Sequence, residues 1–158
     1  MNTINTIIEK LREALALVMR PTISVKLDEG AFLPVRAHDT DAGADIRTPC
    51  AFTVPARGTA TVATGVHVQT PPHCATMIKS KSGLNVRYDI TSEGVVDEGF
   101  TGEVIVKLYN HGEHPKRFER GDKITQIVVV PVLYPLYAQA EEIDGGERGD
   151  AGYGSTGR

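Results

Sequence analysis

The sequence has only two cysteines, Cys50 and Cys74, which lie far apart and in no C-x-x-C pairing. Such sparse cysteines predict buried thiols in a reducing compartment, not a disulfide framework. No apolar run approaches the length that spans a membrane. Charged residues between positions 9 and 13 interrupt any signal-peptide core. We therefore expect a cytoplasmic protein without a membrane partner.

An excess of positive charge is also missing. The chain has 17 Lys and Arg against 20 Asp and Glu, for a net charge of −3, and no basic stripe is present. This balance argues against a nucleic-acid polymer as the main ligand, whereas a nucleotide needs only a few local cations. The length of 158 residues, 41% of them hydrophobic, predicts one domain whose hydrophobic core is large enough to be stable without disulfides or structural metal ions.

Residues 1–20 differ from the rest because their apolar side chains recur at helical spacing, at Ile4, Ile8, Leu11, Leu15 and Val18. Thr6 and Glu9 fit a capping box, and Pro21 follows as a stop. The pattern predicts an amphipathic N-terminal helix. A lone helix needs cover for its apolar face, which its own domain, a sister subunit or a protein partner would supply.

After Pro21 short strand-like runs alternate with turn signals. The runs cover residues 23–27, 50–55, 59–70, 74–80, 86–91, 103–110 and 124–136. They predict an all-β jelly roll or barrel over residues 21–143. The nearly all-apolar run 124–136 predicts a central strand pair covered on both faces, with bends or edges at Pro131 and Pro135. The glycine-rich residues 144–158 predict a flexible tail.

Three aspartates crowd the segment HDTDAGAD, residues 38–45. A calcium loop starting at Asp39 would need an acid at its twelfth position, where Cys50 stands. An Asx-rich turn accounts for such a cluster, and one carboxylate at a strand start could also hold magnesium through its waters. His111 and His114 form an H-x-x-H pair without further ligands nearby, so a zinc site is not expected.

Three further segments carry candidate chemistry. In KSKSGLN, backbone N–H groups around Gly83 could bind a phosphate, although an ordinary polar turn would have the same sequence pattern. In GVVDEGFTGE, Asp97 could be a general base and Phe100 a platform for a flat ligand, although a plain hairpin is the common meaning. Gln126 sits inside an apolar strand and is either structural or ligand-facing.

Together and in this order, these segments resemble the five motifs of the trimeric dUTPase family. The matching stretches are DAGADI, KSGL, GVVDEGFTGE, GDKITQI and RGDAGYGSTG, which span the chain from Asp41 to its end. The resemblance implies a β jelly roll, a homotrimer with active sites shared between subunits, and hydrolysis of dUTP to dUMP and pyrophosphate. An enzyme of this kind limits uracil in DNA and supplies dUMP for dTMP synthesis.

The resemblance also implies a role for each matched residue. Asp97 matches the base that activates water for attack on the α-phosphorus, and Asp45 matches the carboxylate that holds Mg²⁺ through water. The hairpin that contacts uracil and sugar contains Gly94, Val95, Val96, Phe100 and Gly102. The phosphate contacts fall on Lys81, Ser82, Gly83 and Gln126. The tail that closes as a lid over the substrate contributes Arg148, Tyr153, Gly154, Ser155 and Thr156.

The chain departs from the family pattern in a few places. Lys81 stands for the usual arginine, which keeps the charge but loses the bidentate fork. Phe100 replaces the usual tyrosine, so its ring can pack on the deoxyribose without a hydroxyl bond. In the tail, Ala151 stands where glycine is common, and Tyr153 replaces phenylalanine but keeps a ring for stacking on uracil.

Two alternatives remain at this stage. A dCTP deaminase shares a related fold and resembles GFTGEVIVKLYN, but its catalytic glutamate falls on Lys107, which cannot shuttle protons in the same way. The other is an interaction protein of the dUTPase fold, for which the N-terminal helix would supply a binding surface.

Overall fold

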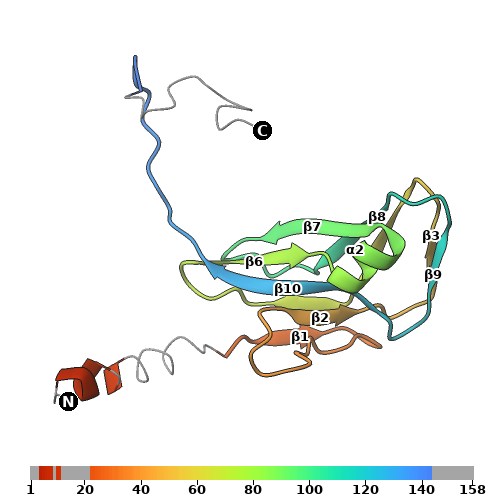
Figure 1. Ribbon diagram of the computed structural model, residues 1–158, viewed down its shortest axis with the longest axis horizontal. Helices are drawn as coiled ribbons and strands as arrows, with labels where there is room; N and C mark the ends of the chain where they lie inside the picture. The colour runs from red at the N-terminus through yellow and green to blue at the C-terminus, as the bar shows by residue number, and fades with distance from the viewer. Residues whose placement is uncertain (1–3, 9, 12–21, 144–158) are drawn as a thin grey trace.

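The computed structural model describes residues 4–8, 10–11 and 22–143 of the chain (Figure 1). Residues 4–8 and 10–11 are helical, in agreement with the predicted N-terminal helix. The exposed fractions of Ile4 and Leu11 are 66% and 63%, so apolar surface of this segment is open to solvent. Within the described residues, no helix is both long and apolar enough to cross a membrane.

The body is built of short antiparallel strands, as the sequence predicts. In chain order the elements are β1 (Val25–Leu27), β2 (Ala44–Arg47), β3 (Phe52–Val54), β4 (Thr59–Ala63), β5 (Val66–Val68), β6 (Cys74–Lys79), α2 (Ser82–Tyr88), β7 (Ile90–Val96), β8 (Ile105–Asn110), β9 (Lys116–Phe118) and β10 (Lys123–Pro131). Six strands form one sheet in the order β2-β10-β6-β7-β8-β4. The pairs β1-β5 and β3-β9 form two small sheets.

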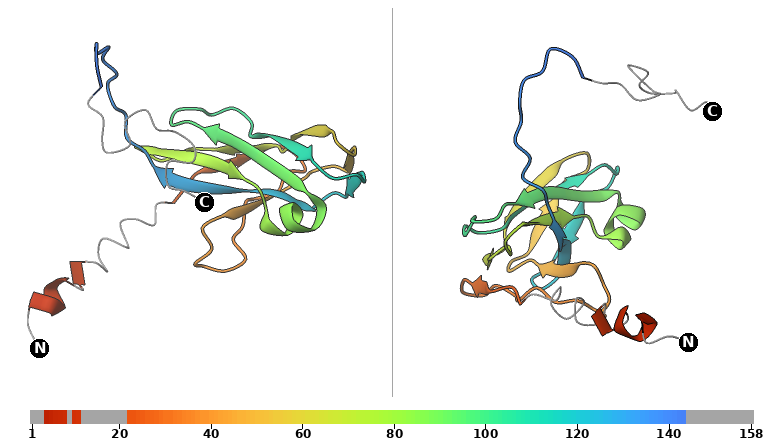
Figure 2. Two further views of the ribbon diagram at one scale, coloured as in Figure 1. Left: turned by 45° about the horizontal axis from the view of Figure 1, so that its top comes forward. Right: turned by 90° about the vertical axis from the view of Figure 1, so that its left-hand side faces the viewer.

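The large sheet curls around one apolar core, and the small sheets lie against it (Figure 2). Alternation along β8 sends Val106 and Leu108 inward, while Ile105 and Lys107 face outward. The buried core consists of Ile46, Val54, Val62, Val66, Val68, Ile78, Ile90, Val96, Val104, Val106, Leu108, Phe118, Ile124 and Ile127. The jelly-roll-like, all-β prediction is therefore confirmed.

The structure corrects several predicted elements. The segment read as a turn followed by a strand over 86–91 is instead α2, and strand β7 begins only at Ile90. Val86 and Tyr88 suggested a strand, but both are exposed on the helix. Asp89 ends the helix in the left-handed conformation, with φ of 54°. The run 59–70 divides into β4 and β5 at Gly65, whose φ is +66°.

The apolar run 124–136 also differs from its prediction. It forms one strand, β10, hydrogen-bonded to β2 on one side and β6 on the other, so its central position is confirmed but a strand pair is wrong. The strand ends at Pro131, which cannot donate to a ladder. Beyond it, Leu133 and Leu136 are almost fully exposed, because the chain there leaves the body (Figure 1).

Candidate active site

A pocket of about 330 Å³ opens beside the paired strands β2 and β10 and the start of α2. The residues that line it are Ala37, Asp41, Ala42, Gly43, Asp45, Lys81, Lys123, Gln126 and Val128. Seven of them belong to the motif stretches that the sequence singles out: Asp41, Ala42, Gly43 and Asp45 from the first, Lys81 from the second, and Lys123 and Gln126 from the fourth. The fold thus brings together side chains from distant parts of the chain.

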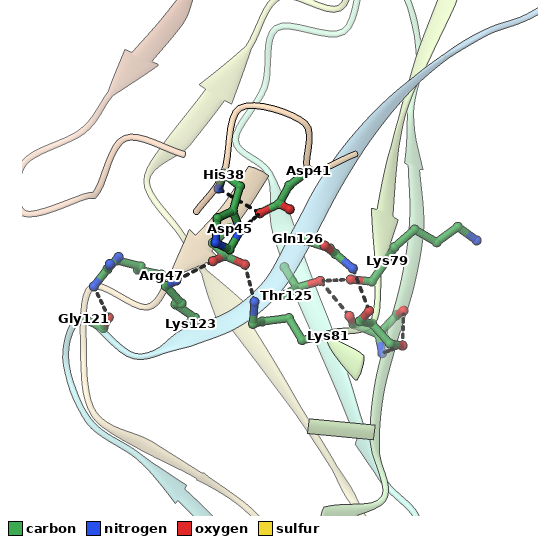
Figure 3. Close-up of polar contacts among 12 residues, drawn as sticks. His38, Asp41, Asp45, Arg47, Lys79, Lys81, Gly121, Lys123, Thr125 and Gln126 are labelled. Carbon is green, nitrogen blue, oxygen red and sulfur yellow. Dashed lines mark hydrogen bonds and ion pairs between the residues drawn. The ribbon is translucent and has the colours of Figure 1, made fainter. Parts of the chain in front are cut away.

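Asp45 is the charged centre of this pocket. It lies on β2 opposite Gln126 of β10, and only 8% of its surface is exposed. Lys81 contacts one carboxylate oxygen, and the Nζ of Lys123 lies 2.6 Å from the other (Figure 3). Burial raises the pKa of the Asp45 carboxyl, but the hydrogen bonds from Lys123 and Lys81 outweigh it and leave the pKa below its usual value. Asp45 is therefore ionised at neutral pH.

The two lysines come from different elements. Lys81 is the residue before the first turn of α2, and Lys123 begins β10. Together they carry one more charge than Asp45 neutralises. The carboxylate of Asp41, which also lines the pocket, accepts a hydrogen bond from the backbone N–H of His38, so the side of the pocket formed by Lys81 and Lys123 is the one suited to an anion. Sequence reasoning missed Lys123, although its place three residues before Gln126 in GDKITQI was a usable signal.

Gln126 and Gly43 depend on each other. The Nε2 of Gln126 donates to the carbonyl oxygen of Ser80 at 3.0 Å, so the polar group predicted within an apolar strand has a partner. A Cβ at position 43 would collide with the Oε1 and Cδ of Gln126. The glycine of DAGADI is therefore required by the close approach of the glutamine side chain.

The predicted phosphate cradle is the first turn of α2, not an open loop. Ser82 and Gly83 are exposed, and a Cβ at position 83 would meet no atom within 4 Å. The first N–H groups of a helix have no partner within the helix. This turn therefore presents backbone donors at an unobstructed surface beside Lys81.

The residues predicted for the base and the sugar lie in the loop between β7 and β8. Asp97 follows the last residue of β7 and is exposed, and its backbone carbonyl accepts a hydrogen bond from the N–H of Phe100 at 3.2 Å. Gly99 has φ of +84°, which allows this tight turn. Next to Asp97, the carboxylate of Glu98 accepts from the Tyr134 hydroxyl at 2.5 Å and from the His73 N–H at 2.9 Å.

Phe100 lies over Gly102 in the same loop. A Cβ at position 102 would collide with the ring, whose Cε2 would be 2.9 Å away. On β7, a Cβ at Gly94 would lie 3.0 Å from the Cδ1 of Ile78, so that position is also closely packed. Val95 is exposed and Val96 buried, as alternation along the strand requires. All five predicted hairpin residues thus lie together.

The pocket and the hairpin lie at opposite ends of strands β6 and β7. Thr76 pairs with Val96 and Lys79 with Glu93, so Asp97 lies just past one end of the pair and Lys81 past the other. The offset between Thr76 and Lys81 corresponds to about 16 Å along an extended strand. Figure 1 shows α2 at one end of the sheet and the end of β7 at the other. A single chain does not bring Asp97 to Asp45.

Two other predictions meet different outcomes. The tail residues Arg148, Tyr153, Gly154, Ser155 and Thr156 lie outside the described residues. Among residues 4–8, 10–11 and 22–143, no group of three His, Cys, Asp or Glu side chains is placed to hold a metal ion. The described residues around Asp45 therefore supply no group of three metal ligands, and the one other carboxylate that lines the pocket is that of Asp41.

Comparison with known proteins agrees with the motif order. A model of the dUTPase family matches residues 30–157, so the chain belongs to the dUTPase family. It is 37% identical over 135 residues to the deoxyuridine 5'-triphosphate nucleotidohydrolase of Clostridium acetobutylicum, covering 84% of this chain and 93% of that protein. The protein of the same name from Solanum lycopersicum is 38% identical over 133 residues, covering 84% and 79%.

Solved structures show the same fold. The dUTPase of Staphylococcus bacteriophage 80alpha with dUPNHPP is 29% identical, with a TM-score of 0.77 over 87% of this chain and 99% of that chain. A mutant dUTPase from phage phi11 of S. aureus, whose structure shows coordination of a structural Mg(II) ion, is 25% identical. Its TM-score is 0.71, with 77% of this chain and 98% of that chain covered.

Proposed function

We propose that this protein hydrolyses dUTP to dUMP and pyrophosphate, with Asp97 as the base that activates water for attack on the α-phosphorus. The observation that carries the proposal is the family match over residues 30–157, which contains every motif stretch. Asp97 is exposed at the end of β7, where its carboxylate is accessible to a water molecule and a substrate.

The pocket end binds the phosphate chain. Lys81, the exposed first turn of α2 at Ser82 and Gly83, and Gln126 provide a cation, backbone donors and an amide close together. Phosphoryl transfer needs positioning and charge stabilisation more than covalent help from the protein. These groups supply both, because Lys81 and Gln126 are already held by Asp45 and the Ser80 carbonyl.

The residues present fit magnesium only as an ion carried by the substrate. Asp45 is ionised and faces the pocket, but its two oxygens are occupied by Lys81 and Lys123. No cluster of three acidic, His or Cys ligands exists among the described residues. A metal bound to phosphate oxygens needs one carboxylate acting through water, and Asp45 can take that role. When bound, Mg²⁺ would neutralise charge on the triphosphate.

The hairpin end binds the nucleoside. Backbone groups of Gly94, Val95, Val96 and Gly102 read the uracil edge, and Phe100 packs against the deoxyribose. A polar edge matched to uracil would leave unpaired groups against cytosine, a mismatch that can reject a competitor by about 10⁴. The close packing of Gly94 on Ile78 and of Phe100 on Gly102 supports a rigid surface for this readout.

The active site is shared between subunits of a homotrimer. The support is the separation of Asp97 from Lys81 along β6 and β7, which leaves each chain with two incomplete halves. Mixing Asp97→Asn chains with Lys81→Ala chains, each of low activity, should therefore restore turnover. Light scattering of the wild-type protein gives the mass of the active species. An active monomer would overturn the shared site.

The tail closes over the bound substrate as a lid. Tyr153 stacks on uracil, while Arg148, Gly154, Ser155 and Thr156 bind the terminal phosphate. We expect deletion of residues 147–158 to lower kcat by on the order of 10², because positioning and phosphate stabilisation are lost. The melting curve should stay unchanged. Full turnover by the truncated chain would show that the tail has no role in catalysis.

A nucleotide panel tests the activity itself. Pyrophosphate release is measured with dUTP, dCTP, dTTP and UTP, with and without Mg²⁺, and ammonia release is followed with dCTP. We expect magnesium-dependent pyrophosphate from dUTP alone at an appreciable rate. The alternative, deamination of dCTP, places Lys107 where an acid is needed, and this lysine is exposed on β8 with its Nζ 5.3 Å from the Tyr109 ring centroid. Ammonia as the main product would contradict the proposal.

A further inference from the structure

His67 contacts the loop of Phe100 from outside the family motifs. It is the middle residue of β5, and 18% of its side chain is exposed. Its Nδ1 lies 3.0 Å from the carbonyl oxygen of Thr101, and its Nε2 lies 3.0 Å from the Oδ2 of Asp28. The ring therefore connects the residue after β1 to the loop between β7 and β8.

The protonation state of the ring follows from its two partners. A carbonyl and a carboxylate both accept hydrogen bonds, whereas a neutral imidazole has only one donor. Both contacts are satisfied only when each ring nitrogen carries a proton. The hydrogen bond to Asp28, followed by that to the Thr101 carbonyl, raises the pKa of His67 above its usual value.

Other charged groups around His67 modulate this arrangement. Lys26 pairs with His67 across β1 and β5, and its Nζ lies 3.3 Å from the second oxygen of Asp28. Its charge lowers the pKa of His67, but less than the hydrogen bond to Asp28 raises it. On the loop side, the carboxylate of Glu103 is engaged by the backbone N–H of Gly65 at 2.6 Å.

The Thr101 carbonyl is the anchored backbone group that directly follows Phe100 in the chain. Further along the loop, Val104 donates its N–H to Val66 at 2.8 Å, and Glu103 accepts from Gly65. The Thr101 carbonyl belongs to the peptide bond that leads into Gly102, on which the Phe100 ring lies. Phe100 itself is 47% exposed, so its ring depends on the backbone beneath it for a defined position.

We infer that His67, protonated on both ring nitrogens, is a positioning residue that anchors the Thr101 carbonyl and thereby holds Phe100 where it limits the sugar. The inference rests on the proposed function of Phe100 at the deoxyribose. Loss of either proton leaves one acceptor without a donor. The loop then relaxes, and a ribose 2'-hydroxyl is excluded less strictly.

The sign of the pH effect follows from the raised pKa. The doubly protonated form prevails below the folded pKa of His67 and is lost as the pH rises through it. The ratio of kcat/KM for dUTP to that for UTP should therefore fall by about threefold to tenfold across this pH range, on the scale of one hydrogen bond. Ionisation of the triphosphate affects both substrates and cancels in the ratio.

The experiment follows two independent readouts in the full-length protein. NMR titration without nucleotide gives the pKa of His67 and the pH dependence of the Gly102 amide signal. Steady-state kinetics gives the dUTP/UTP ratio at each pH. We expect all three midpoints to coincide. In Asp28→Asn they should move together to lower pH, and in His67→Gln the ratio and the amide signal should be flat. His114→Gln, an exposed histidine outside this contact, is the matched control.

Each outcome decides one claim. The anchoring role would be overturned if the Gly102 amide signal did not change as His67 titrates. It would also be overturned if the dUTP/UTP ratio of kcat/KM had the same pH profile in His67→Gln as in the wild type. If His67→Gln fails to fold, the paired midpoints in wild type and Asp28→Asn still decide it. Absence of pyrophosphate release from dUTP at every pH would instead refute the proposed function, while the NMR titration would still test the anchor.

Discussion

At the α2 end of strands β6 and β7, charges are enclosed and paired, whereas at the opposite end carboxylates stand exposed in a short loop. Asp45 is held by two lysines at the edge of a pocket. Asp97 accepts a hydrogen bond only through its backbone oxygen in the contacts of the described residues. The comparison indicates that ion pairs hold the Asp45 carboxylate in a fixed position at the first end. At the second end, the Asp97 carboxylate is free to accept a proton.

The largest effect is expected at the exposed end. Asp97→Asn removes the base, so kcat for dUTP should fall by about 10² or more, the usual scale for losing general-base catalysis. The melting temperature should stay the same, because an exposed side chain contributes little to stability. Kinetics and a melting curve on the same sample check both. A variant with nearly full kcat would assign the base elsewhere.

At the enclosed end, we expect a substitution to lower the free energy of unfolding, which a substitution at the exposed end should leave unchanged. Asp45→Ala leaves Lys81 and Lys123 without their shared acceptor, and the free energy of unfolding should fall by about 1–3 kcal/mol. The value lies below that of a fully buried pair because both lysines are partly exposed and can turn to water. Denaturant unfolding measures it, with Asp97→Ala as the exposed control. Equal stability of the two variants would contradict the proposed difference between the enclosed and the exposed end.

The difference in unfolding free energy between the wild type and Asp45→Ala should also depend on pH. The folded pKa of Asp45 is lowered, so its contribution is fully present above the ordinary carboxyl pKa of about 3.9 and is lost as the pH falls through the folded value. The unfolding curves of wild type and Asp45→Ala should therefore converge in acid. A gap that persists in acid would mean that packing, not charge, causes the loss.

The smallest effect concerns the flank of the exposed loop. Tyr134→Phe removes the hydroxyl that Glu98 accepts, but both side chains are solvent-accessible, so the melting temperature should change by no more than about 2 °C. A modest rise in KM with kcat retained is the expected kinetic result, because the neighbouring loop loses one restraint. A large fall in kcat would instead place Tyr134 in the chemistry.

Much of the fold follows from local patterns. Alternating apolar residues predict β8, and the glycine and proline punctuation predicts most of its neighbours. Helix α2 escapes such reasoning because its apolar Val86 and Tyr88 are exposed and stand in a β-like sequence. Strands β2 and β9 escape it because charged residues, such as Asp45 and Lys116, occupy strand positions.

The site is predictable in its parts but not in its arrangement. The first four motif stretches identify residues that the structure places in a pocket or a hairpin, and the fifth lies outside the described residues. The distance between Asp97 and Lys81 depends on the register of β6 with β7, which no local pattern in either strand specifies. The role of Gly43 is likewise invisible until β10 brings Gln126 against it.

The seat of Phe100 on Gly102 has a consequence for redesign. Attempts to widen sugar tolerance would naturally replace the aromatic residue, which also discards the surface that faces the ligand. A side chain at position 102 would instead lift the ring, since a single Cβ there already collides with it. The size of the residue at position 102 therefore sets the position of the Phe100 ring. Substitutions of increasing size, beginning with Gly102→Ala, should displace the ring by increasing amounts and change the space left for the sugar, while the aromatic face that contacts the ligand is kept.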